Sequence, residues 1–188
     1  MHFSNTIVVI DTETTGLDAR RCAVVEIGAV AVNGRTLAEI SRFQTLVHPF
    51  PGHLWTAEAE QVHGHSWESL YEARPEYHAL SDLLDWLDRL GRYTQFAGWN
   101  VAFDMAFLEA AIRRCDLLDL WRKRDFHALD IWTMYQTAYL LNVVPVNLRS
   151  LNSYCDWKSR LRGKQHSALE DAEITAEALR TLMETAKP

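Results

Sequence analysis

The chain has 188 residues, of which 48% are hydrophobic and 23% charged, and this composition predicts one globular domain over residues 1–188. Its formal net charge of −6 excludes a general attraction to nucleic acid or anionic membranes, so a polyanionic partner needs local positive charge or bound metal. Three widely spaced cysteines argue against a disulfide framework, and no segment has the pattern of a signal peptide or membrane span, so we expect a cytoplasmic protein.

The first part of the chain predicts strands joined by a hairpin. The apolar run over 7–10 is typical of a strand buried on both faces, and Gly16 closes the turn that follows it. Residues 23–32 and 39–47 are rich in strand-forming residues. The Asn-Gly pair at 33–34 between them predicts a tight hairpin turn.

Helices and strands alternate in the rest of the chain. Thr56 ahead of acidic residues predicts the N-cap of a short helix, and apolar residues at helical spacing predict the longer ones. The expected helices cover 56–62, 75–90, 101–115, 131–141, 147–155 and 167–184, and the later strands cover 93–99 and 125–129. This order predicts an α/β sheet of mixed direction with helices on both sides, in which working groups lie beyond the strand ends.

Two carboxylates, Asp11 and Glu13, follow the first strand with one Thr between them. Residues two apart in a strand face the same way, so both side chains can reach one spot, where they repel each other. A divalent cation with hard oxygen preference, Mg²⁺ or Mn²⁺, removes this repulsion and turns the pair into ligands. The alternative is that Asp11 caps a turn and Glu13 is solvated.

A third carboxylate lies in the segment NVAFD at 100–104. Asp104 is in the first turn of a helix that directly follows a strand. Asn100 would cap this helix, and Phe103 would pack or stack. The alternative is an acid that only stabilises the helix dipole.

The last helix begins with HSALED at 166–171. His166 and Asp171 are separated by somewhat more than one helical turn, so the two side chains can reach a common centre. The alternative is a surface histidine and a solvated aspartate. A titratable base beside a fourth carboxylate favours a catalytic role.

In this order, D-x-E-T-T-G, N-x-x-F-D and H-x-x-x-x-D resemble the three motifs of the DEDDh (DnaQ-like) 3′–5′ exonucleases. That family includes the proofreading epsilon subunit of bacterial DNA polymerase III. The resemblance extends over about residues 7–182. It implies a ribonuclease-H-like α/β fold with a mixed, mostly five-stranded sheet flanked by helices on both sides.

The resemblance also implies the reaction. A metal-dependent 3′–5′ exonuclease would release nucleoside 5′-monophosphates from single-stranded or frayed 3′ ends, with DNA preferred. Asp11, Glu13, Asp104 and Asp171 would hold two Mg²⁺ or Mn²⁺ ions, about 3.5–4 Å apart in such sites. His166 would take the proton from the attacking water.

Substrate contacts are implied by the same family. The loop after the first strand would wrap the 3′-terminal nucleotide, and apolar side chains would support its base in a way that tolerates any sequence. For Leu17 and Val62, ordinary core packing is the alternative. The expected contacts are Thr12, Thr14, Thr15, Gly16, Leu17, Glu58, Val62, His63, Asn100 and Phe103.

A basic run precedes His166. Lys158, Arg160, Arg162 and Lys164 would bind strand phosphates, or form a solvated loop. Trp99 stands where relatives often carry His, and it would alter the floor of the site or only its packing. Asp130 opens a helix after a strand, and we interpret it as a helix cap.

The implied partner is the 3′ end of single-stranded nucleic acid, DNA in preference to RNA, with a polymerase or a second copy of the chain as further partners and no membrane. An exoribonuclease of the same family is one alternative, because no residue visibly recognises a 2′-hydroxyl. A non-catalytic polymerase-associated module and a phosphoesterase for mononucleotide esters are two others.

Overall fold

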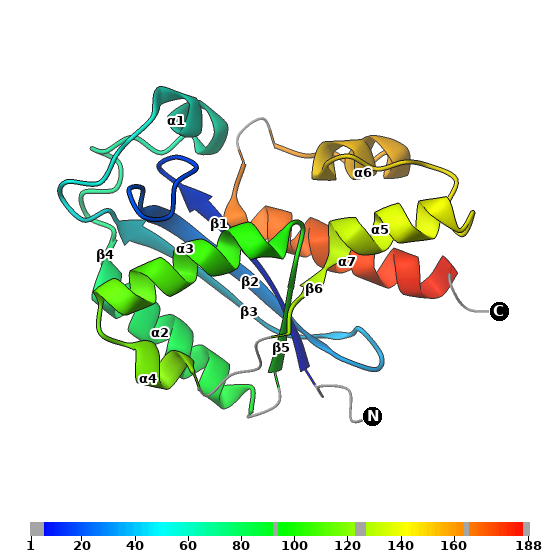
Figure 1. The fold of residues 1–188 in the computed structure, drawn as a ribbon, viewed down its shortest axis with the longest axis horizontal. Coiled ribbons are helices and arrows are strands. Elements are labelled where there is room, and N and C mark those ends of the chain that lie inside the picture. The colour runs from blue at the N-terminus through cyan, green and yellow to red at the C-terminus, as the bar shows by residue number, and fades with distance from the viewer. Residues whose placement is uncertain (1–5, 92–93, 123–126, 164–165, 186–188) are drawn as a thin grey trace.

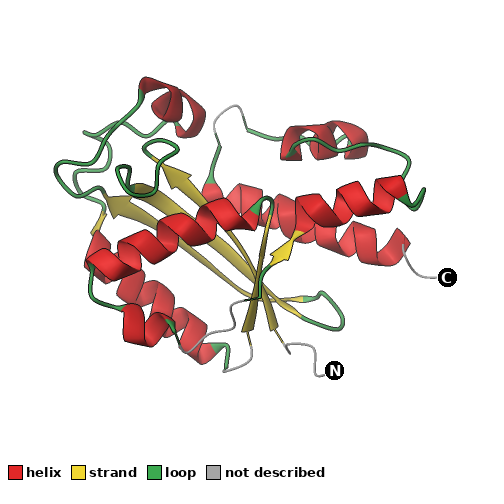
Figure 2. Cartoon of the chain, viewed as in Figure 1, coloured by secondary structure: helices red, strands yellow, loops and turns green. Residues whose placement is uncertain are grey.

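The computed structural model describes residues 6–91, 94–122, 127–163 and 166–185, which form one mixed sheet with helices on both faces (Figures 1 and 2). The sheet order is β4-β3-β2-β1-β5-β6; β1, β2 and β3 form an antiparallel meander, while β5 runs parallel to β1 and β6 to β5. The strands are β1 (Thr6–Thr14), β2 (Val24–Asn33), β3 (Glu39–His48), β4 (Arg74–Pro75), β5 (Thr94–Gly98) and β6 (Leu129–Asp130). The helices are α1 (Ala57–His63), α2 (Glu76–Arg89), α3 (Val101–Arg114), α4 (Leu118–Trp121), α5 (Ile131–Leu140), α6 (Leu151–Lys158) and α7 (Ala168–Thr185).

The predicted α/β architecture is confirmed, with two differences in its elements. The sheet has six strands rather than five, because the short strand β4, which was not predicted, pairs with β3, while β6 corresponds to the strand expected at 125–129. The short helix α4 was not predicted. Residues 93, 125 and 126 of the predicted strands lie outside the described residues. Within the described ranges, no helix is both long and apolar enough to cross a bilayer.

The predicted hairpin is present and the chain turns after Asn33, but the connection is longer than a two-residue turn. β2 ends at Asn33, and the connection to β3 takes residues 34–38. The Asn33 Oδ1 accepts hydrogen bonds from the backbone N–H groups of Arg35 and Thr36, both at 3.0 Å. This side chain therefore organises a longer loop, in which Leu37 has a positive φ of 58°.

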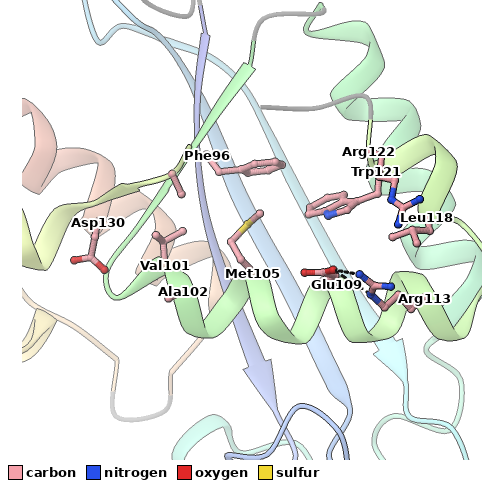
Figure 3. Close-up of a pocket in the computed structure, with 11 residues that line it drawn as sticks. Phe96, Val101, Ala102, Met105, Glu109, Arg113, Leu118, Trp121, Arg122 and Asp130 are labelled. Atoms are coloured by element: carbon pink, nitrogen blue, oxygen red, sulfur yellow. Dashed lines mark hydrogen bonds and ion pairs between the residues drawn. The ribbon is translucent and has the colours of Figure 1, made fainter. Parts of the chain in front are cut away.

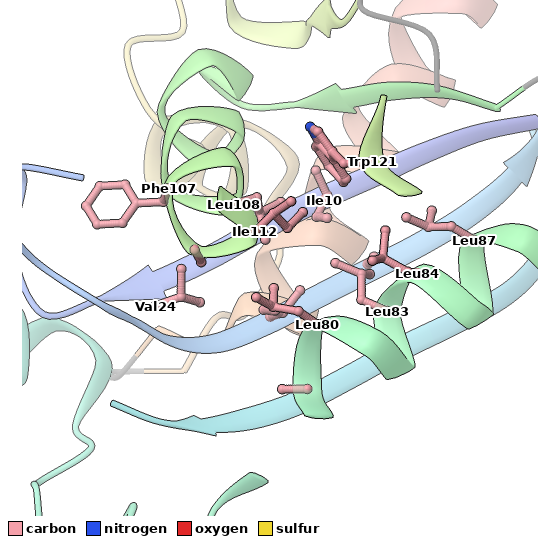
Figure 4. Packing of buried hydrophobic residues seen from close by; sticks show 14 of the residues in the cluster. Ile10, Val24, Leu80, Leu83, Leu84, Leu87, Phe107, Leu108, Ile112 and Trp121 are labelled. Atoms are coloured by element: carbon pink, nitrogen blue, oxygen red, sulfur yellow. The ribbon is translucent and has the colours of Figure 1, made fainter. Parts of the chain in front are cut away.

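Alternation along β1 divides the core into two halves. Val8 and Ile10 pack against α2 and α3, as Figure 4 shows for Ile10, whereas Ile7 and Val9 pack against α5, α6 and α7. Burying a large aliphatic side chain of this kind contributes roughly 1.5–3 kcal/mol. Because successive strand residues face opposite sides, Asp11 continues the face of Ile7 and Val9 and points toward α7.

The start of α7 lies directly on β2 at Gly28. A Cβ added to Gly28 would lie 2.1 Å from the backbone N of Leu169 and 2.2 Å from the carbonyl carbon of Ala168. Neither atom belongs to a flexible side chain, so only glycine lets the helix approach this closely. This contact sets the height of the first turn of α7 above the sheet.

Gly28→Ala is expected to lower the free energy of unfolding by about 2–3 kcal/mol, because the added methyl group forces strand and helix apart. Urea denaturation measures the change. Gly52→Ala is the control: this residue has a φ of +99° and nothing within 4 Å of the added Cβ, so its cost is backbone strain of about 1–2 kcal/mol alone. A Gly28→Ala protein as stable as the parent would contradict the close approach.

Candidate active site

The first strand brings two carboxylates to the edge of the sheet nearest α7. Asp11 and Glu13 lie in the last residues of β1, where Glu13 is opposite Glu26 of β2 and the register shifts between Glu13 and Thr14. Glu13 is 7% exposed. The irregularity ends the regular ladder and starts the loop that leads to Leu17.

Asp104 reaches the same region from the first turn of α3. Its Oδ1 accepts hydrogen bonds from the backbone N–H and the hydroxyl of Thr12, at 2.9 and 2.8 Å. Thr12, predicted to contact substrate, therefore holds Asp104 beside the end of β1. Asn100 occupies the N-cap position of α3 with φ 64° but forms no side-chain cap, so its predicted capping role is wrong. Its side chain instead lines the hollow next to the acids.

His166 and Asp171 come from the entry and the first turns of α7. Ligand atoms of Glu13, His166 and Asp171 all lie within 4.8 Å of one another, a group that could hold a metal ion. The backbone N–H of His166 donates to the carbonyl of Val62 at 2.9 Å, which ties this segment to α1. The predicted convergence of the third motif on the first is therefore present.

A guanidinium group already lies against this carboxylate cluster. Arg162, with 8% of its side chain exposed, forms an ion pair with Asp171 and donates a hydrogen bond to Asn152. The other oxygen of Asp171, Oδ1, is buried without a hydrogen-bond partner among the described residues. The positive charge of Arg162 thus lies beside Asp171, whose Oδ1 is available as a ligand.

Two other members of the basic run, Arg160 and Lys158, also have partners within the protein. Arg160 forms an ion pair with Glu177 of α7. The Lys158 ammonium lies 4.2 Å from the centre of the Trp157 ring, and Lys164 lies outside the described residues. A role of Arg160 and Arg162 toward phosphate remains a prediction.

The pKa values of all four clustered carboxylates are raised. Burial, reinforced by Asp104, Asp171 and Glu13, raises the pKa of Asp11 well above its usual value. Burial raises the pKa of Glu13 to about 8, and it raises the pKa of Asp104 to about 7 despite the hydrogen bonds from Thr12. Burial likewise raises the pKa of Asp171, which Arg162 opposes. The metal-free cluster therefore retains protons that exposed carboxylates would have lost.

These shifts predict that the metal-free protein loses stability as pH rises. Glu13 ionises near pH 4.5 in the unfolded chain and near 8 in the folded protein. Between these values the unfolded state has released a proton that the folded state keeps, so unfolding becomes more favourable with increasing pH. We expect a loss on the order of a few kcal/mol between pH 4.5 and 8, measured by thermal unfolding in EDTA.

The control is Glu13→Gln, which should flatten this pH dependence because it removes one of the titrating groups. Saturating Mn²⁺ should flatten it as well, since a bound cation favours the ionised carboxylates. A metal-free parent protein whose melting temperature does not change over this range would contradict the clustering of charges.

Glu26 is a buried carboxylate that the motifs did not point to. It is 2% exposed and accepts hydrogen bonds from Gln44 at 2.8 Å and from the Ser167 hydroxyl at 3.0 Å, while His65 Nε2 lies 3.1 Å away. These contacts fasten β2 to β3, to the loop after α1 and to the residue next to His166. The only sequence signal is a glutamate inside the apolar segment AVVEIGAV.

The loop after β1 is held from inside by its threonines. The Thr14 hydroxyl donates to the Gly16 carbonyl at 2.8 Å, and the Thr15 hydroxyl donates to the Leu54 carbonyl at 2.6 Å. Leu17 is 89% exposed, so the alternative that it is a core residue is wrong. The loop thus exposes the apolar side chain of Leu17, while hydrogen bonds from Thr14 and Thr15 hold its backbone.

Helix α1 and the start of α3 place the remaining predicted contacts. Val62 is 44% exposed, which excludes a core position, and Glu58 is exposed in the first turn of α1. His63 is buried and stacks on His65 with ring centroids 5.3 Å apart; burial lowers its pKa to about 4. The ring of Phe103 lies 4.8 Å from that of Phe107, centroid to centroid, and is half-buried.

Two hollows of similar size lie on different sides of the β5–α3 segment. One, of about 490 Å³, includes Asp11, Asn100, His166 and Asp171 and continues past Trp99 and Trp132 toward the start of α6. The other, of about 520 Å³, is lined by Phe96, Met105 and Trp121 among others and contains none of the clustered acids (Figure 3). The first is the candidate active site.

The cap of α5 follows the prediction. The Asp130 carboxylate accepts a hydrogen bond from the backbone N–H of Thr133 at 2.7 Å. It is therefore engaged as a helix cap, as interpreted from the sequence.

Comparison with known proteins identifies relatives over almost the whole chain. The family model described as Exonuclease matches residues 8–179. The chain is 30% identical over 180 residues to DNA polymerase III subunit epsilon of Rickettsia conorii, a match that covers 94% of this chain and 73% of that protein. It is 29% identical over 183 residues to ribonuclease T of Vibrio vulnificus, covering 90% of this chain and 80% of that one.

Solved structures share the fold. The nuclease domain of 3′hExo, described as a DEDDh family member and bound to rAMP, superposes with a TM-score of 0.77 at 19% identity, over 98% of this chain and 94% of that one. The chain spans a smaller part of other matches: 12% of the PolC-type DNA polymerase III of Thermotoga maritima, at 27% identity, and 41% of the exonuclease I of Methylocaldum szegediense, at 19% identity and a TM-score of 0.83.

Proposed function

Since this chain belongs to the exonuclease family, we propose that it is a metal-dependent 3′–5′ exonuclease that releases nucleoside 5′-monophosphates from single-stranded or frayed 3′ ends, preferring DNA. The observation that carries the proposal is the convergence of carboxylates from β1, α3 and α7 with one histidine at the end of β1. The relatives that are polymerase III subunits support DNA as substrate and a polymerase as a further partner.

The metal ligands would be Asp11, Glu13, Asp104 and Asp171, holding two Mg²⁺ or Mn²⁺ ions. The residues fit such cations, because they are hard oxygen ligands whose mutual repulsion raises their pKa values, and because Asp171 Oδ1 has no partner among the described residues. When bound, the ions would supply positive charge at the scissile phosphate and lower the pKa of the attacking water. Arg162 forms its ion pair with the other oxygen of Asp171, Oδ2, so Oδ1 is available to a cation while this pair persists.

His166 would be the general base. One third of its side chain is exposed, so its ring borders both the acids and solvent in the hollow. Burial, followed by the charge of Arg162, lowers its pKa from 6.5 in the metal-free protein. The ring is therefore neutral at neutral pH, the form in which a ring nitrogen accepts a proton from water.

The terminal nucleotide would lie between the loop after β1 and the start of α3. Leu17 and Val62 offer exposed apolar surface, and Phe103 offers a half-buried ring. Such surfaces bind a base through apolar contact and stacking, which any of the bases can form. Glu58, His63 and Asn100 would border this nucleotide. Thr12 would hold Asp104, and the hydrogen bonds of Thr14 to Gly16 and of Thr15 to Leu54 would shape the loop that wraps the terminal nucleotide.

Matched end-labelled oligomers test the proposal. We expect 12-nucleotide DNA, labelled at its 5′ end, to shorten progressively from its 3′ end in Mn²⁺, faster than RNA of the same sequence and far faster than a mononucleotide ester. EDTA should stop the reaction. Asp11→Asn is the control that ties cleavage to this site.

Two outcomes would change the proposal. Faster cleavage of RNA would make the protein an exoribonuclease, the alternative that its 29% identity to ribonuclease T favours. Absence of metal-dependent cleavage of both oligomers, with metal binding intact, would overturn the enzymatic function and leave a non-catalytic module.

A further inference from the structure

A third hollow, of about 530 Å³, lies beside the loop after β1 and carries positive charge. Its described lining consists of Arg20, Arg21, residues 50–54 and Arg114, none of which carries a carboxylate. Its walls are joined where Cys22 and Leu54 pair as an isolated parallel bridge, in which the backbone N–H of Leu54 donates to the Arg21 carbonyl at 2.7 Å. The loop after β1 thus forms one wall of the hollow and is bonded to the segment 50–54 that forms another.

Two of its arginines are available to a ligand. Arg20 and Arg21 are exposed, and among the described residues neither guanidinium forms an ion pair. Arg114, by contrast, binds the buried carboxylate of Glu76 through two nitrogens, at 3.0 and 2.5 Å. Arg113, at the hollow in Figure 3, is likewise paired, with Glu109. In a chain of net charge −6, two adjacent unpaired guanidiniums favour a polyanion at this place.

The distance between the hollow and Leu17 corresponds to a few nucleotides of a single-stranded nucleic acid. Leu17 precedes Arg21 by four residues, so their Cα atoms are at most about 14 Å apart. The backbone N–H of Arg21 donates to the Asp18 carbonyl at 2.9 Å, which makes the connection a turn and shortens this span. A stacked strand advances about 3.4 Å per nucleotide, so the hollow is reached within roughly four nucleotides of Leu17.

An aromatic surface accompanies the charge. Phe50 is 59% exposed, and the His53 ring meets it edge-on with centroids 6.4 Å apart. His53 Nδ1 lies 2.8 Å from the Phe50 carbonyl, so the two rings are held in one loop. Exposed aromatic rings beside arginines are the elements with which proteins bind single strands irrespective of sequence.

We propose that this hollow binds the same strand two to four nucleotides upstream of its 3′ end, with Arg20 and Arg21 on the phosphates and Phe50 against a base. The inference rests on the proposed exonuclease function and adds the path of the strand away from the site. It also explains how an acidic protein holds a long oligomer while it processes the end.

Arg20→Gln combined with Arg21→Gln tests the inference. Cleavage of a 12-nucleotide single-stranded DNA and of a trimer are compared, together with binding of a fluorescent 12-mer by anisotropy at several salt concentrations. We expect the ratio of kcat/KM for 12-mer over trimer to fall about tenfold, and the slope of log K against log salt to become shallower by about 1.4, since each phosphate contact contributes about 0.7.

The control is Arg35→Gln combined with Arg89→Gln, which removes the same charge at exposed positions in the loop between β2 and β3 and at the end of α2. It should leave both the ratio and the slope as in the parent. If the parent cleaves both oligomers and the Arg20/Arg21 variant changes neither quantity more than the control, the upstream site is overturned while the exonuclease function stands. If the parent cleaves neither oligomer, the proposed function fails, and anisotropy alone decides: loss of 12-mer affinity in the variant supports the hollow as a strand site, and unchanged affinity overturns it.

Discussion

Replacing Asp11 with Asn is expected to reduce exonuclease turnover roughly a thousandfold, about 4 kcal/mol in activation free energy, while it stabilises the metal-free protein. Activity falls because Asp11 is one of the four proposed metal ligands and lines the same hollow as His166 and Asp171. Stability rises because Asp11, whose pKa burial and the neighbouring carboxylates raise, has to keep a proton in the folded state that it loses in the unfolded chain, whereas Asn has no such cost.

The two effects are measured on the same preparation, by cleavage of the 12-mer in Mn²⁺ and by thermal unfolding in EDTA. The increase in melting temperature caused by Mn²⁺ should be smaller in the variant, since one ligand is weaker. Asp85→Asn, an exposed carboxylate on α2, is the control and should change none of the three quantities. An Asp11→Asn protein that melts lower than the parent in EDTA would show that the carboxylate stabilises the metal-free fold and contradict our account.

Replacing His166 with Ala is expected to reduce kcat by about 10²–10⁴-fold, the usual contribution of a positioned general base. The predicted signature is that the metal-induced rise in melting temperature persists, because four carboxylates remain to hold the ions. His78→Ala, an exposed histidine on α2, should retain full activity.

This variant also separates two roles that the geometry permits, since His166 lies within 4.8 Å of ligand atoms of Glu13 and Asp171. A base acts on water and leaves metal affinity nearly intact, whereas a ligand contributes to affinity directly. Loss of the Mn²⁺-induced stabilisation in His166→Ala would therefore show that His166 acts as a metal ligand and not as the general base. Unchanged kcat would remove His166 from the mechanism.

The motifs predicted the family and the fold class from short segments. Membership of the exonucleases and the ribonuclease-H-like α/β sheet with helices on both faces are confirmed. Asp11 and Glu13 share a face because strand periodicity is local, and Asp104, His166 and Asp171 lie near helix starts because capping patterns and apolar spacing are local as well. The cap of α5 by Asp130 was predicted for the same reason.

Local patterns failed where a distant contact decided the outcome. Asn100 adopts a positive φ and lines the hollow instead of capping α3, since the chain has to turn from β5 into a helix that packs across the sheet. The added strand β4 exists only because β3 provides an edge for it. No window of sequence contains these partners.

Residue type and the periodicity within a strand or helix need no knowledge of the rest of the chain, so the candidate residues for the proposed chemistry could be read from the sequence. The contacts between distant segments required the folded chain: Glu26 lies beside Ser167, Arg162 pairs with Asp171, and Arg20 and Arg21, which form no ion pair among the described residues, lie next to the loop after β1. The physical reason is that these pairs depend on how closely α7 approaches the sheet at Gly28 and on how the loops are tied together. Packing sets these distances between segments far apart in the chain.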